Sequence, residues 1–141
     1  MKIASPGNNM FDLNRFIAAQ EKSYENALRE LRAGHKVGHW IWYIFPQHES
    51  LGISAKSKYF GVKSLEEALA YMAHSVLGQR YLECVNALLT HRDCSILEIM
   101  GTDLDAKKLL SSLTLMSTAC PNELLKEAIA AFYSDAYFAE D

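Results

Sequence analysis

The strongest constraint on the fold is the spacing of apolar residues, which recur three and four positions apart over most of the chain. In the first segment the recurring positions are Leu13, Phe16, Ile17, Gln20, Tyr24, Ala27, Leu28 and Leu31. This spacing places their side chains on one face of an α-helix. Asp12 is suited to cap the beginning of this helix, and Gly34 is suited to end it. The pattern therefore predicts an amphipathic helix between these two residues.

Two further helices are predicted from serines that are followed, three positions later, by a glutamate. Ser64 and Glu67 form one such pair, and Ser95 and Glu98 form the other. This is the capping-box pattern, in which each residue satisfies a backbone N–H group of the other. We expect a helix from Ser64 to about residue 74 and a short helix from Ser95 to Gly101.

Three longer segments also show the helical spacing. They begin near Val76, at Thr102 or Asp103, and at Pro121 and Asn122, and they continue to about residues 89, 118 and 132. Their inward faces are predicted to carry Leu77, Tyr81, Cys84, Val85, Leu88 and Leu89 in the first, Leu109, Leu110, Leu113 and Met116 in the second, and Leu124, Leu125, Ala128, Ile129 and Phe132 in the third.

The segment 38–63 is harder to assign. Residues 38–45 are aromatic and β-branched, which is compatible with a strand or with two turns of a buried helix. Residues 46–63 contain Pro46, two glycines and several serines, and we expect them to form the longest irregular segment. With a loose lead-in at 1–11 and an acidic tail at 134–141, the chain is predicted to be one all-α domain of six or seven helices.

Composition and charge narrow the classes of function. The chain has 141 residues, half of them hydrophobic, and a net charge of -3. The densest basic stretch, 56–63, holds only three lysines, so there is no basic stripe of the kind that binds nucleic acid. No apolar run approaches the ~20 residues that cross a bilayer. We expect a soluble cytoplasmic protein with neither nucleic acid nor a membrane as its partner.

The three cysteines do not predict a disulfide framework, because their number is odd and they form no close pairs. Cys84 falls on a predicted apolar face and is expected to be buried. Cys94 and Cys120 lie near predicted helix beginnings, where the pKa of a thiol can fall, so both are candidates for reactive groups.

No metal or cofactor site is predicted. His35 and His39 are four positions apart, but Gly34 and Gly38 interrupt a helix there, so His39 is expected to be partly buried and hydrogen-bonded instead. The chain lacks a P-loop, a G-x-G-x-x-G motif and a G-x-S-x-G motif. The usual sequence support for nucleotide hydrolysis, dinucleotide binding or ester hydrolysis is therefore missing.

One predicted helix carries an unusual polar stripe. Asp105, Lys108 and Ser112 fall on one side of it, and Ser111 lies at the edge. A lysine with a depressed pKa can activate a serine nucleophile. A salt-bridged surface stripe with hydroxyls bonded to the preceding turn explains the same residues. The pattern favours this structural interpretation over catalysis and leaves a ligand-binding edge open.

The aromatic segment 40–45 also has two interpretations. It holds two tryptophans, a tyrosine and a phenylalanine, and Gln47 follows it. Such a cluster usually belongs to the core. Tryptophans also supply flat walls for a ring-shaped ligand, which Gln47 and His39 would then orient.

This segment also resembles a known family. His39-Trp40-Ile41-Trp42-Tyr43-Ile44-Phe45-Pro46-Gln47 is similar to the H-W-M-W-F-I-F-P-Q signature of domain-of-unknown-function family 1810. The likeness covers about residues 10–133 and includes Asp12–Phe16 with Ala19 and Gln20, Leu51 and Gly52 with Ser57 and Tyr59, Ala70 and Tyr71 with His74, Leu77 and Gly78 with Arg80, and Asp105 with Lys108 and Ser111–Leu115.

The resemblance implies an all-α fold, which supports a helix at 38–45, but it implies no established biochemical role. Some relatives carry a calpastatin label, for which a folded helical domain offers no physical support. Leu110 stands where the family usually has a basic residue before Ser111, and the chain is shorter after Phe132. The motif positions that become candidates for ligand binding are His39, Trp40, Trp42, Gln47, Tyr59, Arg80, Asp105, Lys108, Ser111 and Ser112.

We predict that some of these side chains converge on one pocket, with segment 46–63 as its rim. In the first interpretation the domain binds a small polar ligand with a flat ring: Trp40 or Trp42 stacks on it, and Lys108 and Arg80 neutralise its negative charge. Enzymatic activity is left open. In the second interpretation the domain is a non-enzymatic protein-interaction module with an exposed apolar patch, and the motif residues are structural. The sequence indicates no reaction type, ligand or oligomeric state.

Overall fold

The computed structural model describes residues 11–134 and 137. Within this part the chain forms eight α-helices and one 3-10 helix. The elements are α2 (Asn14–Ala33), α3 (Ile41–Ile44), η1 (Glu49–Leu51), α4 (Ala55–Tyr59), α5 (Leu65–Ala73), α6 (Leu77–Leu89), α7 (Ile96–Met100), α8 (Asp103–Ala119) and α9 (Glu123–Phe132). The all-α prediction is confirmed, whereas the predicted lead-in and tail lie almost entirely outside the described residues.

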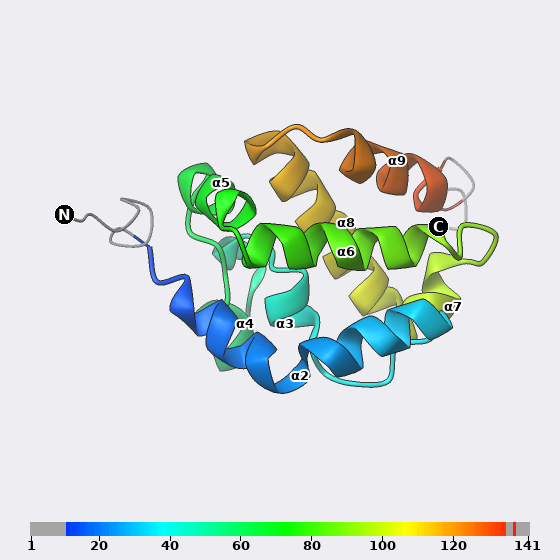
Figure 1. Cartoon of the computed structure of the whole chain (residues 1–141), viewed down its shortest axis with the longest axis horizontal. Helices are drawn as coiled ribbons and strands as arrows, with labels where there is room; N and C mark the ends of the chain where they lie inside the picture. Colours follow the sequence, from blue (N-terminus) through cyan, green and yellow to red (C-terminus); the bar gives the residue numbers. More distant parts are fainter. Residues whose placement is uncertain (1–10, 135–136, 138–141) are drawn as a thin grey trace.

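Helix α6 lies in the middle of the fold, with α2 along one side and α9 along the other (Figure 1). It also packs against α5, while α8 packs against α3, α5, α7 and α9. The apolar faces predicted from the spacing meet in this core. The six residues predicted for the inward face of α6 are all buried, as are Leu109, Leu113 and Met116 of α8 and Leu125, Ala128 and Phe132 of α9.

Most helix boundaries follow the local signals in the sequence. Gly34 and Gly101 end α2 and α7 with φ angles of 78° and 90°, a left-handed conformation that favours glycine. Ser95 and Glu98 form the predicted capping box, and Thr102 caps α8. These boundaries were predictable because capping bonds join residues only a few positions apart.

The beginning of α2 differs from the prediction. Leu13, not Asp12, occupies the N-cap position, and no side chain caps the helix. The side chain of Asp12 is exposed, while its backbone carbonyl accepts a hydrogen bond from Nη1 of Arg15. Arg15 is buried, and its guanidinium, which can only donate, satisfies this carbonyl and does not replace a capping carboxylate.

The segment 38–63 is more helical than its composition predicts. Residues 41–44 form a single helical turn rather than a strand or two turns, and η1 and α4 lie in the segment expected to be irregular. Ser54 and Ser57 form a capping box that begins α4. A helix of five residues is too short to show an apolar period, which is why the prediction missed it.

Candidate functional site

Trp40 is a core residue rather than a wall for a ligand. Its side chain is only 2% exposed, and its indole N–H donates a hydrogen bond of 2.8 Å to Oε1 of Glu30. The Lys36 ammonium lies 5.1 Å from the centre of its ring. The same Glu30 oxygen accepts from the backbone N–H groups of Val37 and Gly38. Trp40 therefore holds the connection between α2 and α3 in place, and no ligand can stack on it.

Trp42 has a different environment because its side chain is only partly buried. The ammonium groups of Lys56 and Lys108 lie 5.0 and 5.1 Å from the centre of its indole ring. These are cation–π contacts from two elements that are far apart in the sequence, α4 and α8. The Nε1 atom of Trp42 is buried and has no hydrogen-bond acceptor among the described residues. The position thus gathers two cations and one unpaired N–H donor.

The carboxylate nearest to this pair of lysines is only partly available to them. Oδ2 of Asp105 lies 2.8 Å from Nζ of Lys36, whereas its Oδ1 is 3.9 Å from Nζ of Lys108. Asp105 therefore neutralises chiefly Lys36, whose side chain is 6% exposed. Lys56 forms no ion pair within the described part of the chain. Positive charge is in excess around Trp42, because Lys108 has only a long contact with a carboxylate that is already paired with Lys36, and Lys56 has none.

An apolar groove lies beside the part of α8 that carries Lys108. Its volume is about 490 Å³, and it is lined by Leu51, Leu65, Leu110 and Leu115, together with Ser111 and two threonines of α8. Leu51 and Leu65 are 55% and 48% exposed. The groove and the lysine pair have the same two walls, because segment 46–63 supplies Leu51 and Lys56 while α8 supplies Leu110 and Lys108.

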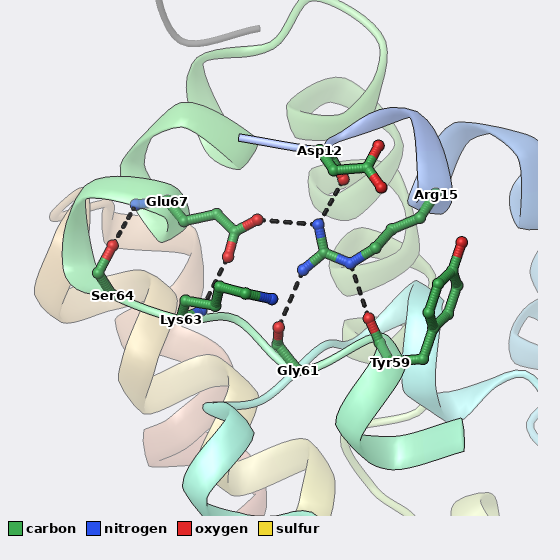
Figure 2. Close-up of polar contacts among 7 residues, drawn as sticks. All are labelled: Asp12, Arg15, Tyr59, Gly61, Lys63, Ser64 and Glu67. Carbon is green, nitrogen blue, oxygen red and sulfur yellow. Dashed lines mark hydrogen bonds and ion pairs between the residues drawn. The ribbon is translucent and has the colours of Figure 1, made fainter. Parts of the chain in front are cut away.

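A buried ion pair fixes the segment that carries Lys56. Nη1 of Arg15 lies 2.9 Å from Oε2 of Glu67, and the two side chains are 3% and 1% exposed. Figure 2 shows the Arg15 guanidinium between three parts of the chain: the beginning of α2, the end of α4 and the beginning of α5. Its Nε and Nη2 donate to the backbone carbonyls of Tyr59 and Gly61, at 2.8 and 2.9 Å.

Glu67 is satisfied on both of its oxygens, which corrects the predicted capping box. Ser64 accepts from the backbone N–H of Glu67 as expected, but Glu67 does not return a bond to Ser64. Its Oε1 instead accepts from the backbone N–H of Lys63, and its Oε2 binds Arg15 (Figure 2). The charge of the guanidinium outweighs a neutral backbone N–H as a partner. Sequence analysis missed this pair because its members are 52 positions apart.

The other candidate residues lie elsewhere. His39 is exposed rather than partly buried, and Gln47 is half-buried, with its backbone carbonyl accepting from Val62. The Tyr59 side chain is 56% exposed and packs edge-on against Phe60. The contacts in the structure therefore join Trp42, Lys108 and Asp105, and no hydrogen bond or ring contact among the described residues joins His39, Gln47 or Tyr59 to them.

Arg80 lies in a second groove, between α2 and α6, with a volume of about 1020 Å³. Its guanidinium is 4.8 Å from the ring centre of Tyr24 and donates to Gln20 and Glu21, both at 3.3 Å. Arg32 and Glu83, which also line this groove, form an ion pair of 3.5 Å. Two of the three arginines that line this groove are therefore paired with a glutamate, and Arg29 donates to Asn26.

Ser112 is not available for nucleophilic chemistry. It is fully buried, and its hydroxyl shares a hydrogen bond of 2.8 Å with the hydroxyl of Tyr81. Burial raises the pKa of Tyr81 above its usual value, so the phenol keeps its proton. Burial likewise raises the pKa of Cys84 to about 12, so this thiol is not a nucleophile at neutral pH. Both groups belong to the core that joins α6 to neighbouring helices.

Neither a metal cluster nor a membrane-spanning helix is found in the described part of the chain. No three His, Cys, Asp or Glu side chains come together there in a way that would hold a metal ion. No helix there has the length and apolar character needed to cross a bilayer.

The fold and the site define an all-α, single-domain protein with a lysine-flanked tryptophan on its surface. The family described as "Protein of unknown function (DUF1810)" matches residues 10–139, so the chain belongs to this family and the resemblance is confirmed. The crystal structure of the conserved hypothetical protein Rv1873 from Mycobacterium tuberculosis has 41% sequence identity and a TM-score of 0.84. The match covers 92% of this chain and 96% of that chain. No curated protein matches the chain.

Proposed function

We propose that this protein binds a small anionic molecule at the lysine-flanked face of Trp42. The observation that carries the proposal is the pair of ammonium groups, 5.0 and 5.1 Å from one indole ring. Two like charges brought to one ring repel each other unless an anion joins them. The unpaired N–H of Trp42 is buried, so it marks an unusual environment for this indole but is not counted as a donor to the anion.

An anion at this position would satisfy several groups together. A carboxylate or phosphate oxygen can accept from both ammonium groups, and a flat ring attached to it can lie against the exposed part of Trp42. A hydrogen bond to a charged group contributes about 1.5–3 kcal/mol net. Two such bonds support affinity in the micromolar to millimolar range, which suits a metabolite.

The proposal keeps some of the candidate residues and omits others. It keeps Trp42, Lys108 and Ser111, with Asp105 positioning Lys108, and it adds Lys56. It leaves out Trp40 and Ser112, which are buried in the core, and Arg80, which lies in the groove between α2 and α6. It also leaves out His39, Gln47 and Tyr59, for which no hydrogen bond or ring contact with Trp42 is found among the described residues. No hydrogen bond joins Ser111 to a base among the described residues, so the proposal is binding without catalysis.

A thermal-shift and calorimetric titration tests this proposal, with inorganic phosphate, benzoate and adenosine monophosphate as probes. A ligand at about 100 times its Kd should raise the free energy of unfolding by about 2.7 kcal/mol. Binding also changes Trp42 fluorescence, which can be read in a Trp40→Phe background. The double variant Lys56→Met/Lys108→Met should lose about tenfold or more in affinity.

Lys58→Met is the matched control, because Lys58 is an exposed lysine on the same helix as Lys56. It should leave the affinity within about twofold of the parent, since residues two positions apart on a helix do not share a face. If none of the three probes binds, or if the double variant binds them as well as the parent does, the proposal is wrong.

A second candidate is the protein-interaction module, which the exposed apolar residues of segment 46–63 favour. Ile53 is 93% exposed and Leu51 is 55% exposed. A protein partner would cover these side chains and exclude water from them. Light scattering across a range of protein concentrations, with Ile53→Ser as the comparison, separates self-association through this segment from a monomer that binds small anions.

We also propose that the protein resides in the cytoplasm, where thiols remain reduced. All three cysteines are free, and Cys94 is exposed. Cell fractionation with an antibody against the chain tests this assignment.

A further inference from the structure

We infer that the anion bound at Trp42 is amphiphilic, with an acidic head group at Lys56 and Lys108 and an apolar body along the groove of α8. This inference rests on the proposed function and extends it to the chemical class of the ligand. It would not follow from the lysines alone, because a small inorganic anion would satisfy them. The groove beside the lysines adds a place for an apolar group on the same ligand.

The two lysines do not line the apolar groove themselves, but each lies near residues that do. Lys108 and Ser111 are one helical turn apart on α8, and Ser111 lines the groove. On the opposite wall, Leu51 and Lys56 both belong to the segment that leads from η1 into α4. A ligand that contacts both lysines is therefore directed between the same two walls into the groove.

The lining of the groove suits a hydrocarbon rather than a polar group. Four leucines form most of it, and the side chains that accompany them carry hydroxyls but no charge. Two of those leucines, Leu51 and Leu65, remain about half exposed, so an apolar ligand would remove leucine surface from water. The volume of about 490 Å³ lies within the range of small-molecule sites.

The larger groove between α2 and α6 does not offer the same combination. Two of its three arginines are paired with glutamates, Arg32 with Glu83 and Arg80 with Glu21, and Arg29 donates to Asn26. A ligand there would have to break existing ion pairs. At Trp42 the positive charge is in excess, and the apolar groove is adjacent.

The test is a calorimetric titration with butyrate, hexanoate and octanoate, each below its micellar concentration. The head group is constant in this series, so any gain in affinity comes from the hydrocarbon. We expect the affinity to rise about twofold to threefold per added methylene, which is less than the gain for full burial because the groove is open on one side. Octanol, which lacks the charge, should bind about tenfold more weakly than octanoate. Butyl phosphate and octyl phosphate distinguish a phosphate head group from a carboxylate.

Two variants assign each part of the ligand to its part of the surface. Leu51→Ser should reduce the affinity for octanoate about fivefold while leaving butyrate within twofold, because only the longer chain reaches the groove. Leu97→Ser is the matched control, since Leu97 is a similarly exposed leucine on α7 and should change neither value. Lys56→Met/Lys108→Met should weaken all three carboxylates by a similar factor.

The outcomes separate this inference from the function on which it depends. Equal affinity for butyrate and octanoate, lost in the double lysine variant, overturns the amphiphilic ligand and leaves anion binding intact. Equal binding of octanol and octanoate overturns the role of the lysines. If neither carboxylates nor phosphates bind at any chain length, the proposed function and this inference are both wrong.

Discussion

The two charged clusters that flank segment 46–63 differ in how completely their charges are matched. At Arg15 and Glu67, every nitrogen of the guanidinium donates to an oxygen, and both carboxylate oxygens accept. At Lys56 and Lys108, two ammonium groups contact one indole ring, and only Lys108 has a carboxylate oxygen nearby, at 3.9 Å. In the first cluster the charged groups are buried and all hydrogen-bonded. In the second, at the surface, the ammonium groups have more N–H donors than nearby acceptors.

This difference indicates that the two clusters have separate roles. A buried charge is tolerated only when partners replace the water that it loses, so the Arg15–Glu67 cluster fixes the fold. An excess of donors at the surface contributes little to folding and is available to an outside acceptor. The first cluster also serves the second, because Arg15 binds the end of the helix that carries Lys56. We therefore expect stability and binding to respond to different substitutions.

The largest loss of stability is expected from Arg15→Met. It leaves the Glu67 carboxylate buried without a counter-charge, which should lower the free energy of unfolding by about 3–5 kcal/mol. Urea denaturation followed by circular dichroism measures this change. In Arg15→Met/Glu67→Met both charges are gone, and we expect at least half of the loss to be recovered. A single variant as stable as the parent would mean that the cluster does not hold the fold.

A smaller loss is expected from Glu30→Gln, about 1–2 kcal/mol at neutral pH, because the carboxylate accepts from three N–H groups. Burial alone would raise the pKa of Glu30. Hydrogen bonds from Gly38, Val37 and Trp40, with the nearby Lys36 charge, lower it below 4.5 overall. Its contribution is therefore present above about pH 4.5 and is lost as the pH falls through the lower folded-state pKa. Denaturation curves across that interval should converge for the two proteins, and parallel curves would contradict this.

Ser112→Ala should lower the free energy of unfolding by about 1 kcal/mol, because the Tyr81 hydroxyl loses its buried partner. In the double variant Ser112→Ala/Tyr81→Phe no unpaired hydroxyl remains, so the second substitution should cost little more. Anion affinity should be unchanged in both proteins. A loss of affinity with intact stability would return Ser112 to the binding site.

The smallest effect on stability is expected from Lys56→Met and Lys108→Met, each within about 0.5 kcal/mol of the parent. Combined in one protein, the same substitutions should weaken anion binding about tenfold or more. Thermal denaturation with and without a bound probe gives both quantities in one experiment. If either lysine variant is destabilised by several kcal/mol, the excess charge at Trp42 has a structural role after all.

The sequence determined the local elements of this protein. The apolar period predicted the inward faces of α6, α8 and α9, and the glycines and capping residues marked where α2, α7 and α8 end or begin. These features depend on groups within one or two helical turns, so a pattern of neighbouring residues contains them. Residues 39–47 were also similar enough to the signature of the family to indicate it.

The tertiary structure alone decided which polar groups would meet. Trp40 and Trp42 are two positions apart, yet one is sealed in the core beside Glu30 and the other is flanked by lysines from α4 and α8. From the sequence, Arg15 is an ordinary helical residue and Glu67 is a capping residue. Only the fold shows that they are in contact. Hydrogen bonds and ion pairs act over a few ångströms in space, whatever the distance along the chain. Only the packing of α2, α4, α5 and α8 could therefore show which charges are satisfied and which are not.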